Sequence, residues 1–191
     1  MINIVIPTTP ERKERLKECI ESIHKNSGTE YNIHTYTSEG EGWVKAVHKA
    51  LRGIEGLTVI VGDDMTFDKD WLKILEEEYW KEFPENDGLA QPYDEIHRGL
   101  VAVCPMADAE NLRKYIHKGY THNYSDRELT DIFQNKGKYL YVPESIVNHN
   151  HYVLGKAEND KTYESNKETY VEDRILYRQR INDNYNNNKK I

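Results

Sequence analysis

The first half of the chain alternates short apolar runs with longer stretches in which apolar residues recur at helical spacing. Three apolar runs predict strands, at residues 2–6, 31–37 and 57–61. A helical pattern follows each run, over residues 10–26, 43–51 and 71–79. Alternating strands and helices imply right-handed crossovers between parallel strands. We therefore predict a single-domain α/β fold in which a mainly parallel central sheet is flanked by helices.

The second half carries weaker patterns. Further strands are predicted at 99–103 and 139–142, and further helices near 109–116 and 129–133. The composition becomes polar from residue 158 onward, where Ile175, Leu176 and Tyr177 anchor one predicted terminal helix. The stretch 182–189 is rich in asparagine, so we expect its helix to fray.

Composition narrows the class of protein. A chain of 191 residues is long enough for one domain with a real core, and its net charge of −7 does not suggest nucleic-acid binding. No apolar run is long enough to span a membrane, and the start lacks the basic region of a signal peptide. Cys19 and Cys104 lie in apolar patterns, so we expect buried free thiols and a cytoplasmic protein.

Two adjacent carboxylates follow the third predicted strand, in the stretch TVIVGDDMTF. Asp63 and Asp64 repel each other unless solvent or a cation shares their site. In open α/β sheets, ligands bind at the carboxyl ends of the strands, where this pair lies. The alternative is a turn that caps the helix around Asp70. We favour the ligand site because of its position at the strand end.

Two other strand ends are expected to meet the same edge of the sheet. Pro7, Thr8 and Thr9 end the first strand, and Thr37 ends the second. Parallel strands bring these ends together, beside the acidic pair. The sequence therefore predicts a site built from three strand ends.

Four segments in this order resemble family 2 glycosyltransferases of the GT-A fold. They are IVIPTTPERKERLKECIESI, GEGWVKAVHKAL, VIVGDDMTFDKDWL and YSDRELTDIFQNKGKYLYVPESIVNHNH. The resemblance implies a GT-A domain over 1–163, with a nucleotide-binding half at 1–90 and an acceptor half at 91–163. Residues 164–191 form a polar C-terminal helix or tail. The size and composition look like short viral or phage members, which implies the cytoplasm of a host cell.

The resemblance implies a metal site at the acidic pair. Asp64 matches the family position that holds Mn²⁺ or Mg²⁺, and Asp63 matches the position that contacts ribose or completes the metal shell. His149 matches a histidine that contacts the metal or the diphosphate. Hard cations prefer such oxygen ligands, and a diphosphate beside two carboxylates needs a cation. Met65 stands where the family often has a third acidic residue, which leaves the number of ligands open.

The resemblance also implies a nucleotide-sugar site. Pro7, Thr8, Thr9 and Arg12 match the nucleotide-binding segment, with Arg12 offered to a phosphate as a rigid donor fork. Thr37 lies at a strand end of the same site. The alternative is that Thr9 caps a helix beginning at Pro10 and that Arg12 lies on its solvated face. Asp94, in the segment QPYDE, is a candidate contact of the donor sugar or the acceptor.

The catalytic base is placed on Asp126. In inverting members a carboxylate at this helix start removes the proton of the acceptor hydroxyl, and Glu128 orients it or contacts the acceptor. Ser125 departs from the acidic residue that the family has there. A carboxylate at a helix N-terminus is stabilised as the anion, so we expect a lowered pKa for Asp126. The alternative is a normal N-terminal cap formed by Ser125 or Asp126.

These assignments predict a metal-dependent, inverting glycosyltransferase that uses a UDP- or GDP-sugar and an unknown glycan, protein or lipid acceptor. A nucleotidyltransferase is the first alternative, although the segment PTTPERKER lacks the glycines that such enzymes usually have. A non-catalytic binding module on a degenerate fold is the second, because His48 stands where the family has asparagine. Zinc at His149 and His151 is weaker, since catalytic zinc needs three protein ligands.

Overall fold

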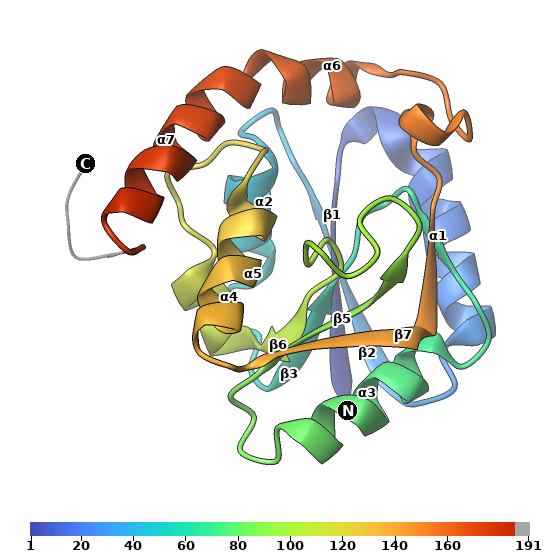
Figure 1. Ribbon diagram of the computed structural model, residues 1–191. Coiled ribbons are helices and arrows are strands. Elements are labelled where there is room, and N and C mark those ends of the chain that lie inside the picture. Colours follow the sequence, from blue (N-terminus) through green and yellow to red (C-terminus); the bar gives the residue numbers. More distant parts are fainter. Residues whose placement is uncertain (186–191) are drawn as a thin grey trace.

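The computed structural model describes residues 1–185, which form a seven-stranded sheet with helices on both faces (Figure 1). The strands, in the spatial order β2-β1-β3-β6-β5-β7-β4, are β1 (Ile2–Thr8), β2 (Tyr31–Thr37), β3 (Leu57–Ile60), β4 (Met65–Phe67), β5 (Leu89–Asp94), β6 (Met106–Asp108) and β7 (Tyr139–His149). The helices are α1 (Lys13–Asn26), α2 (Trp43–Ala50), α3 (Trp71–Glu82), α4 (Ala109–Tyr115), α5 (Ser125–Asn135), α6 (Lys161–Glu168) and α7 (Tyr170–Asn182).

The α/β fold class predicted from the sequence is confirmed. Strands β1, β2, β3, β5 and β7 run in one direction, and β6 and β4 run in the other. The parallel part includes all three strands predicted from the first half of the chain. The two reversed strands make the sheet mixed and let the second half join it through antiparallel pairs.

Two apolar layers hold the helices on the sheet. Alternate residues of a strand point to opposite faces, and β1 follows this rule. Ile4 and Ile6 join the layer under α1 and α3, whereas Val5 joins the layer under α2, α4 and α5. Both layers contain fully buried aromatic side chains, such as Trp71 in the first and Phe133 in the second. The sheet therefore has one packed core on each face.

The predicted strand at 99–103 is wrong, and β5 at Leu89–Asp94 takes its place in the sheet. Pro92 in the middle of β5 argued against a strand, because proline has no N–H for a ladder of hydrogen bonds. The structure accommodates it with a shift of register against β7 between Pro92 and Tyr93. The strand predicted at 139–142 exists and continues to His149.

Two predicted helix caps do not form. Thr9 has extended backbone and no capping hydrogen bond, and the chain makes a 3₁₀ turn over Pro10–Arg12 before α1 begins. Neither Asp68 nor Asp70 is bound to the start of α3 as a side-chain cap, and Asp70 has left-handed backbone with φ 61°. The Asp70 carboxylate lies against Gly28, where a Cβ atom would come within 2.5 Å of it.

The predicted domain limit at residue 163 falls inside α6. Helices α6 and α7 cross over the top of the molecule in Figure 1, above the carboxyl ends of the parallel strands. Leu176 and Tyr177 pack against the core as predicted, whereas Ile175 is exposed. Within the stretch 182–189, where we expect fraying, residues 186–189 lie outside the described range. No helix within residues 1–185 is long and apolar enough to cross a membrane.

Helix α7 is fixed to α5 by a buried ion pair. Arg180 donates from Nε to Oε2 of Glu128 at 2.7 Å, and Tyr120 donates to the same oxygen at 2.6 Å. The Glu128 side chain is 0% exposed. Removing one partner of such a pair leaves an uncompensated charge, which is more costly than removing both.

We predict that Glu128→Gln lowers the free energy of unfolding by about 3–5 kcal/mol, because it leaves Arg180 buried without its counter-charge. Urea denaturation followed by circular dichroism measures the change. Adding Arg180→Met to that variant is expected to restore part of the loss. If the single variant is as stable as the wild type, the pair does not hold α7 in place.

Candidate active site

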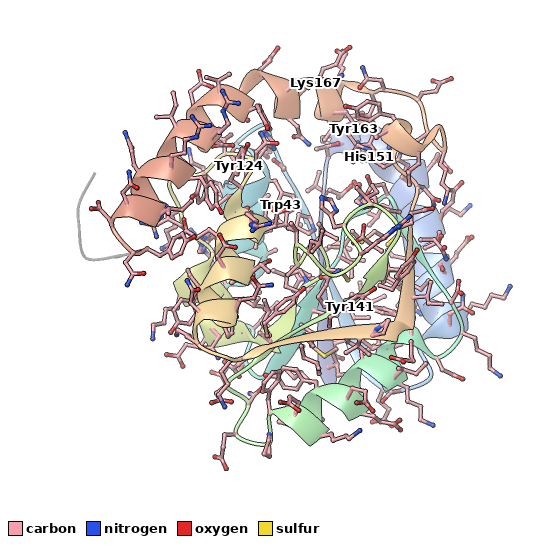
Figure 2. All side chains as sticks on the ribbon, in the orientation of Figure 1. Trp43, Tyr124, Tyr141, His151, Tyr163 and Lys167 are labelled. Atoms are coloured by element: carbon pink, nitrogen blue, oxygen red, sulfur yellow. The ribbon has the colours of Figure 1, made fainter. Side chains whose placement is uncertain are left out.

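A cleft with a volume of about 870 Å³ lies at the carboxyl ends of β1 and β3. Trp43 and Tyr124 lie on its α2–α5 side, and His151 and Tyr163 lie on its α1 side (Figure 2). Its lining comes from both ends of the chain, since it includes the end of β1, the start of α5 and residues of α6. Among the predicted site residues, the cleft is lined by Pro7, Thr8, Thr9, Arg12, Asp63, Asp64, Asp126 and His149.

Asp63 is engaged by the end of β1. The Thr8 hydroxyl donates to its Oδ2 at 2.7 Å, and the Arg12 guanidinium donates from Nη1 to its Oδ1 at 2.9 Å. Burial raises the pKa of Asp63, and the nearby charge of Asp64 adds to the rise, while Arg12 and Thr8 oppose it. Both oxygens of Asp63 therefore have protein partners, and the structure turns this carboxylate toward Thr8 and Arg12.

Asp64 has different partners. Strand β4 pairs with β7 so that Met65 lies opposite His149, and this pairing brings His149 Nε2 to 3.5 Å from Asp64 Oδ1. Tyr163 of α6 donates its hydroxyl to Asp64 Oδ2 at 2.7 Å. Burial opposes the charge of Asp64, but His149, Tyr163 and Arg12 outweigh it and hold the pKa below its usual range. Asp64 is thus the carboxylate that the site keeps ionised.

Gly62 makes room for that carboxylate. A Cβ atom at Gly62 would lie 2.6 Å from Asp64 Oδ1, which is closer than two unbonded atoms can approach. The glycine that ends the buried strand therefore allows Asp64 to turn back toward His149.

Arg12 does not point into the solvated cleft as expected of a phosphate ligand. Its side chain is 7% exposed and its Nε and Nη2 donate to the two oxygens of Asp160, at 2.9 and 3.0 Å. Its guanidinium carbon also lies 4.3 Å from the centre of the Tyr163 ring. With Nη1 bound to Asp63, three of the five N–H donors of Arg12 are engaged by carboxylates of the protein. The alternative of a solvated helix face is wrong for the same reason.

The acidic pair offers only part of a metal site. Within residues 1–185 no group of three or more histidine, cysteine, aspartate or glutamate side chains is arranged to hold a metal ion. Asp64 and His149 face each other, however, and His149 Nδ1 is buried without a hydrogen-bond partner among the described residues. Two protein ligands fit Mg²⁺ or Mn²⁺ when substrate oxygens complete the shell, as is common at nucleotide sites.

Asp126 lies on the opposite wall, at the start of α5. The loop before it is fixed by Asp173 of α7, which accepts hydrogen bonds from the backbone amides of Thr121, His122 and Asn123. Burial raises the pKa of Asp126, and the amide of Arg127 and the charge of His97 only partly oppose the rise. The lowered pKa expected from the helix N-terminus is therefore wrong, because desolvation is the larger effect.

Three other predicted site residues do not line the cleft. Glu128 is buried in the ion pair with Arg180, so it cannot meet an acceptor. Thr37 is exposed at the edge of the sheet, and its neighbour Ser38 lines the cleft instead. Asp94 is fully buried and reaches the cleft only through His97, whose Nδ1 lies 3.4 Å from Asp94 Oδ1.

Two site residues that the sequence did not reveal come from the C-terminal segment. Tyr163 and Asp173 lie in a polar region without a motif, and each binds a partner at least 50 positions away. No local pattern encodes such contacts. His97 also lines the cleft, and its spacing from the other histidines is not that of a metal-binding motif.

No protein-family profile matches the sequence, and no curated protein matches it either. Solved structures do match. S. aureus TarS aligns with a TM-score of 0.59 at 12% identity, over 86% of this chain and 38% of that chain. TarS 1-349 in complex with UDP-GlcNAc aligns with a TM-score of 0.57 at 15% identity, over 78% of this chain and 58% of that one.

A putative glucose-1-phosphate thymidylyltransferase from Bacillus anthracis, in complex with a sucrose, aligns with a TM-score of 0.53 at 10% identity. The alignment covers 86% of this chain and 99% of that one. This chain spans less than two thirds of the TarS chains it matches. At these identities the comparisons show the fold alone, which is an α/β fold of the GT-A and nucleotidyltransferase type.

We predict that Arg12→Lys loosens α6, because lysine cannot bridge Asp63 and Asp160 with a planar fork. The free energy of unfolding is expected to fall by about 1–3 kcal/mol, and the amides of α6 to exchange faster with deuterium. Hydrogen exchange with mass spectrometry measures the second effect.

The matched control is Lys13→Arg, at an exposed neighbouring position, which is expected to change neither quantity. Unchanged exchange of α6 in Arg12→Lys would show that the Arg12 contacts do not anchor this helix.

Proposed function

We propose that the protein is a metal-dependent, inverting glycosyltransferase that moves a sugar from a nucleoside diphosphate to an acceptor hydroxyl. The observation that carries the proposal is the arrangement of two unlike carboxylates across one cleft. Asp64 is held ionised at the end of β3, and Asp126 has a raised pKa at the start of α5. Carboxylates whose pKa values are pushed apart are suited to different roles in one reaction.

Asp126 is the proposed general base. It takes the proton of the acceptor hydroxyl as that oxygen forms a bond to the anomeric carbon, and the bond from this carbon to the diphosphate oxygen breaks on the other side. A base works best when its pKa lies near the working pH, so a raised pKa favours Asp126 over an ordinary exposed aspartate. Trp43 and Tyr124 offer flat apolar faces against which a sugar ring can pack.

The balance of charged side chains in the cleft supports the proposal that a metal cation binds there. The lysine and arginine side chains that line it are Arg12 and Lys161, and Arg12 is committed to Asp63 and Asp160. A diphosphate beside Asp63 and Asp64 therefore needs another counter-charge. Asp64 and His149 would hold Mn²⁺ or Mg²⁺, which acts as a Lewis acid on the departing diphosphate.

For the nucleotide base of the donor and for the acceptor, we propose only the chemical class of molecule that this cleft binds. The end of β1 and the loop at Ser38–Gly40 are the proposed nucleotide contacts, with Pro7, Thr8 and Thr9 beside the base or ribose. UDP is the first nucleotide to test, because one of the similar structures binds UDP-GlcNAc. The acceptor is a glycan, protein or lipid that presents a hydroxyl to Asp126.

A nucleotidyltransferase is the second candidate, because the thymidylyltransferase shares the fold. That chemistry transfers a nucleoside monophosphate from a nucleoside triphosphate to a sugar phosphate and releases pyrophosphate, so it needs groups that bind the triphosphate at the first turn after β1. The segment from Pro7 to Arg15 has no glycine to bring backbone amides to a triphosphate, and Arg12 is already bound to carboxylates. These features favour the glycosyltransferase.

We predict that UDP or GDP raises the melting temperature only when Mn²⁺ or Mg²⁺ is present, because binding to the folded state stabilises it. A panel of nucleotide sugars with Mn²⁺ is then assayed for release of nucleoside diphosphate. Asp126→Asn is expected to lower turnover by about 10²–10⁴-fold. Asp64→Asn is expected to abolish the joint effect of metal and nucleotide.

Asp131→Asn is the matched control, because Asp131 lies on α5 but faces Tyr177 and Arg127 away from the cleft. It is expected to keep wild-type turnover. Wild-type turnover in both Asp64→Asn and Asp126→Asn would refute the proposal, and stabilisation by nucleoside triphosphates alone would favour the nucleotidyltransferase.

A further inference from the structure

A buried carboxylate, Asp94, and a half-buried imidazole, His97, form a pair beside the cleft. Asp94 ends β5 and its side chain is 0% exposed. Its Oδ1 accepts hydrogen bonds from the backbone amides of Ile96 and His97, at 3.0 Å each, and lies 3.4 Å from the His97 Nδ1 atom. The turn after β5 is therefore wound around one carboxylate, and the imidazole of His97 is folded back onto it.

The hydrogen bonds of the turn after β5 do not by themselves require a charged residue at position 94. Its two amides use Oδ1, which an asparagine also provides. Asp94 Oδ2 is buried without a hydrogen-bond partner among residues 1–185, so a full negative charge is kept out of water. A buried carboxylate is costly unless a positive charge compensates it. Among the groups that contact Asp94 in the described part of the chain, His97 is the one able to supply that charge.

The other side of the imidazole faces the cleft. The His97 side chain is 34% exposed and lines the same cavity as Asp126. The contact with the Asp94 carboxylate raises the pKa of His97 against the effect of burial, and the charge of Asp126 adds to the rise. In return, the charge of His97 opposes the rise in the pKa of Asp126. The ionisable groups that act on His97 are thus Asp94 from β5 and Asp126 from α5.

We propose that His97, held by the buried Asp94 carboxylate, is a positioning residue that keeps Asp126 ionised and available to take a proton from the acceptor. This inference rests on the proposed function, because it assigns the base to Asp126. Burial raises the pKa of Asp126 and so favours its protonated form. The charge of His97, whose imidazole lines the same cleft, counters that tendency.

The first test measures the electrostatic link without any substrate. The imidazole signals of the full chain are followed by NMR through a pH titration, and His97 is assigned by comparison with His97→Gln. We expect the pKa of His97 to fall by about one unit in both Asp94→Asn and Asp126→Asn. Asparagine at 94 keeps the turn, so a structural role of Asp94 would leave the His97 titration unchanged.

The second test measures transfer as a function of pH. The acid limb of kcat/KM reports the base of the free enzyme. His97→Gln is expected to move that limb upward by about one pH unit and to lower kcat at the acidic end, with little change in KM for the donor. Asp94→Asn is expected to move it in the same direction. The control His24→Gln, on the exposed face of α1, is expected to leave the profile unchanged.

The outcomes separate this inference from the proposed function. If Asp126→Asn abolishes transfer but neither the His97 titration nor the acid limb responds, the glycosyltransferase stands and the role of His97 is overturned. If His97 responds to both aspartates but no nucleotide sugar is turned over, the proposed function falls and the catalytic role of His97 falls with it. A shift in both measurements supports both.

Discussion

The structure depends on how two adjacent carboxylates are buried at the end of one strand. Asp63 and Asp64 are 4% and 8% exposed, and like charges at this depth are unfavourable unless other groups compensate them. Asp63 accepts hydrogen bonds from Thr8 at the end of β1 and from Arg12 in the turn that follows, whereas Asp64 lies against His149 of β7 and accepts from Tyr163 of α6. Arg12 also lies 3.9 Å from Asp64, so it faces both carboxylates. These partners come from both ends of the chain.

The same requirement explains why a polar C-terminal segment is ordered across the cleft. Asp160 accepts hydrogen bonds from Nε and Nη2 of Arg12, whose Nη1 donates to Asp63. Asp173 accepts hydrogen bonds from three backbone amides before α5. Helix α7 has a weak apolar face, so hydrophobic burial alone is a small part of what holds it. Hydrogen bonds to the carboxylates of Asp160 and Asp173 hold the segment instead. The bonds of Asp160 fix the Arg12 side of the cleft, and those of Asp173 fix the side at the start of α5. The same contacts therefore stabilise the C-terminal segment and set the geometry of the site.

Periodicity was sufficient for the first half of the fold, where β1, β2 and β3 and the helices after them lie close to the predicted residues. It failed at β5, because Pro92 breaks the pattern that a central strand normally shows, and at β4, which is too short to give one. The position of Asp63 and Asp64 at a strand end was predictable from topology alone. Their partners were not, since Tyr163 lies 99 positions from Asp64 and acts through a tertiary contact. The error at Glu128 has a local cause: residues two apart on a helix point to nearly opposite sides, so Asp126 and Glu128 cannot share the cleft.

The pKa values of Asp64 and Asp126 shift in opposite directions because the two carboxyl groups have different hydrogen-bond partners. Asp64 is buried and Asp126 is half-buried, and desolvation alone raises the pKa of each. Asp64 receives a hydroxyl and an imidazole in direct contact, which reverse the effect. Asp126 receives one backbone amide and the more distant charge of His97, which only reduce it. A carboxylate with direct donors is suited to remain an anion beside a cation, and one without them is suited to accept and release a proton. Two aspartates in one cleft can thus have pKa values shifted in opposite directions, because the fold brings different groups within hydrogen-bond distance of each.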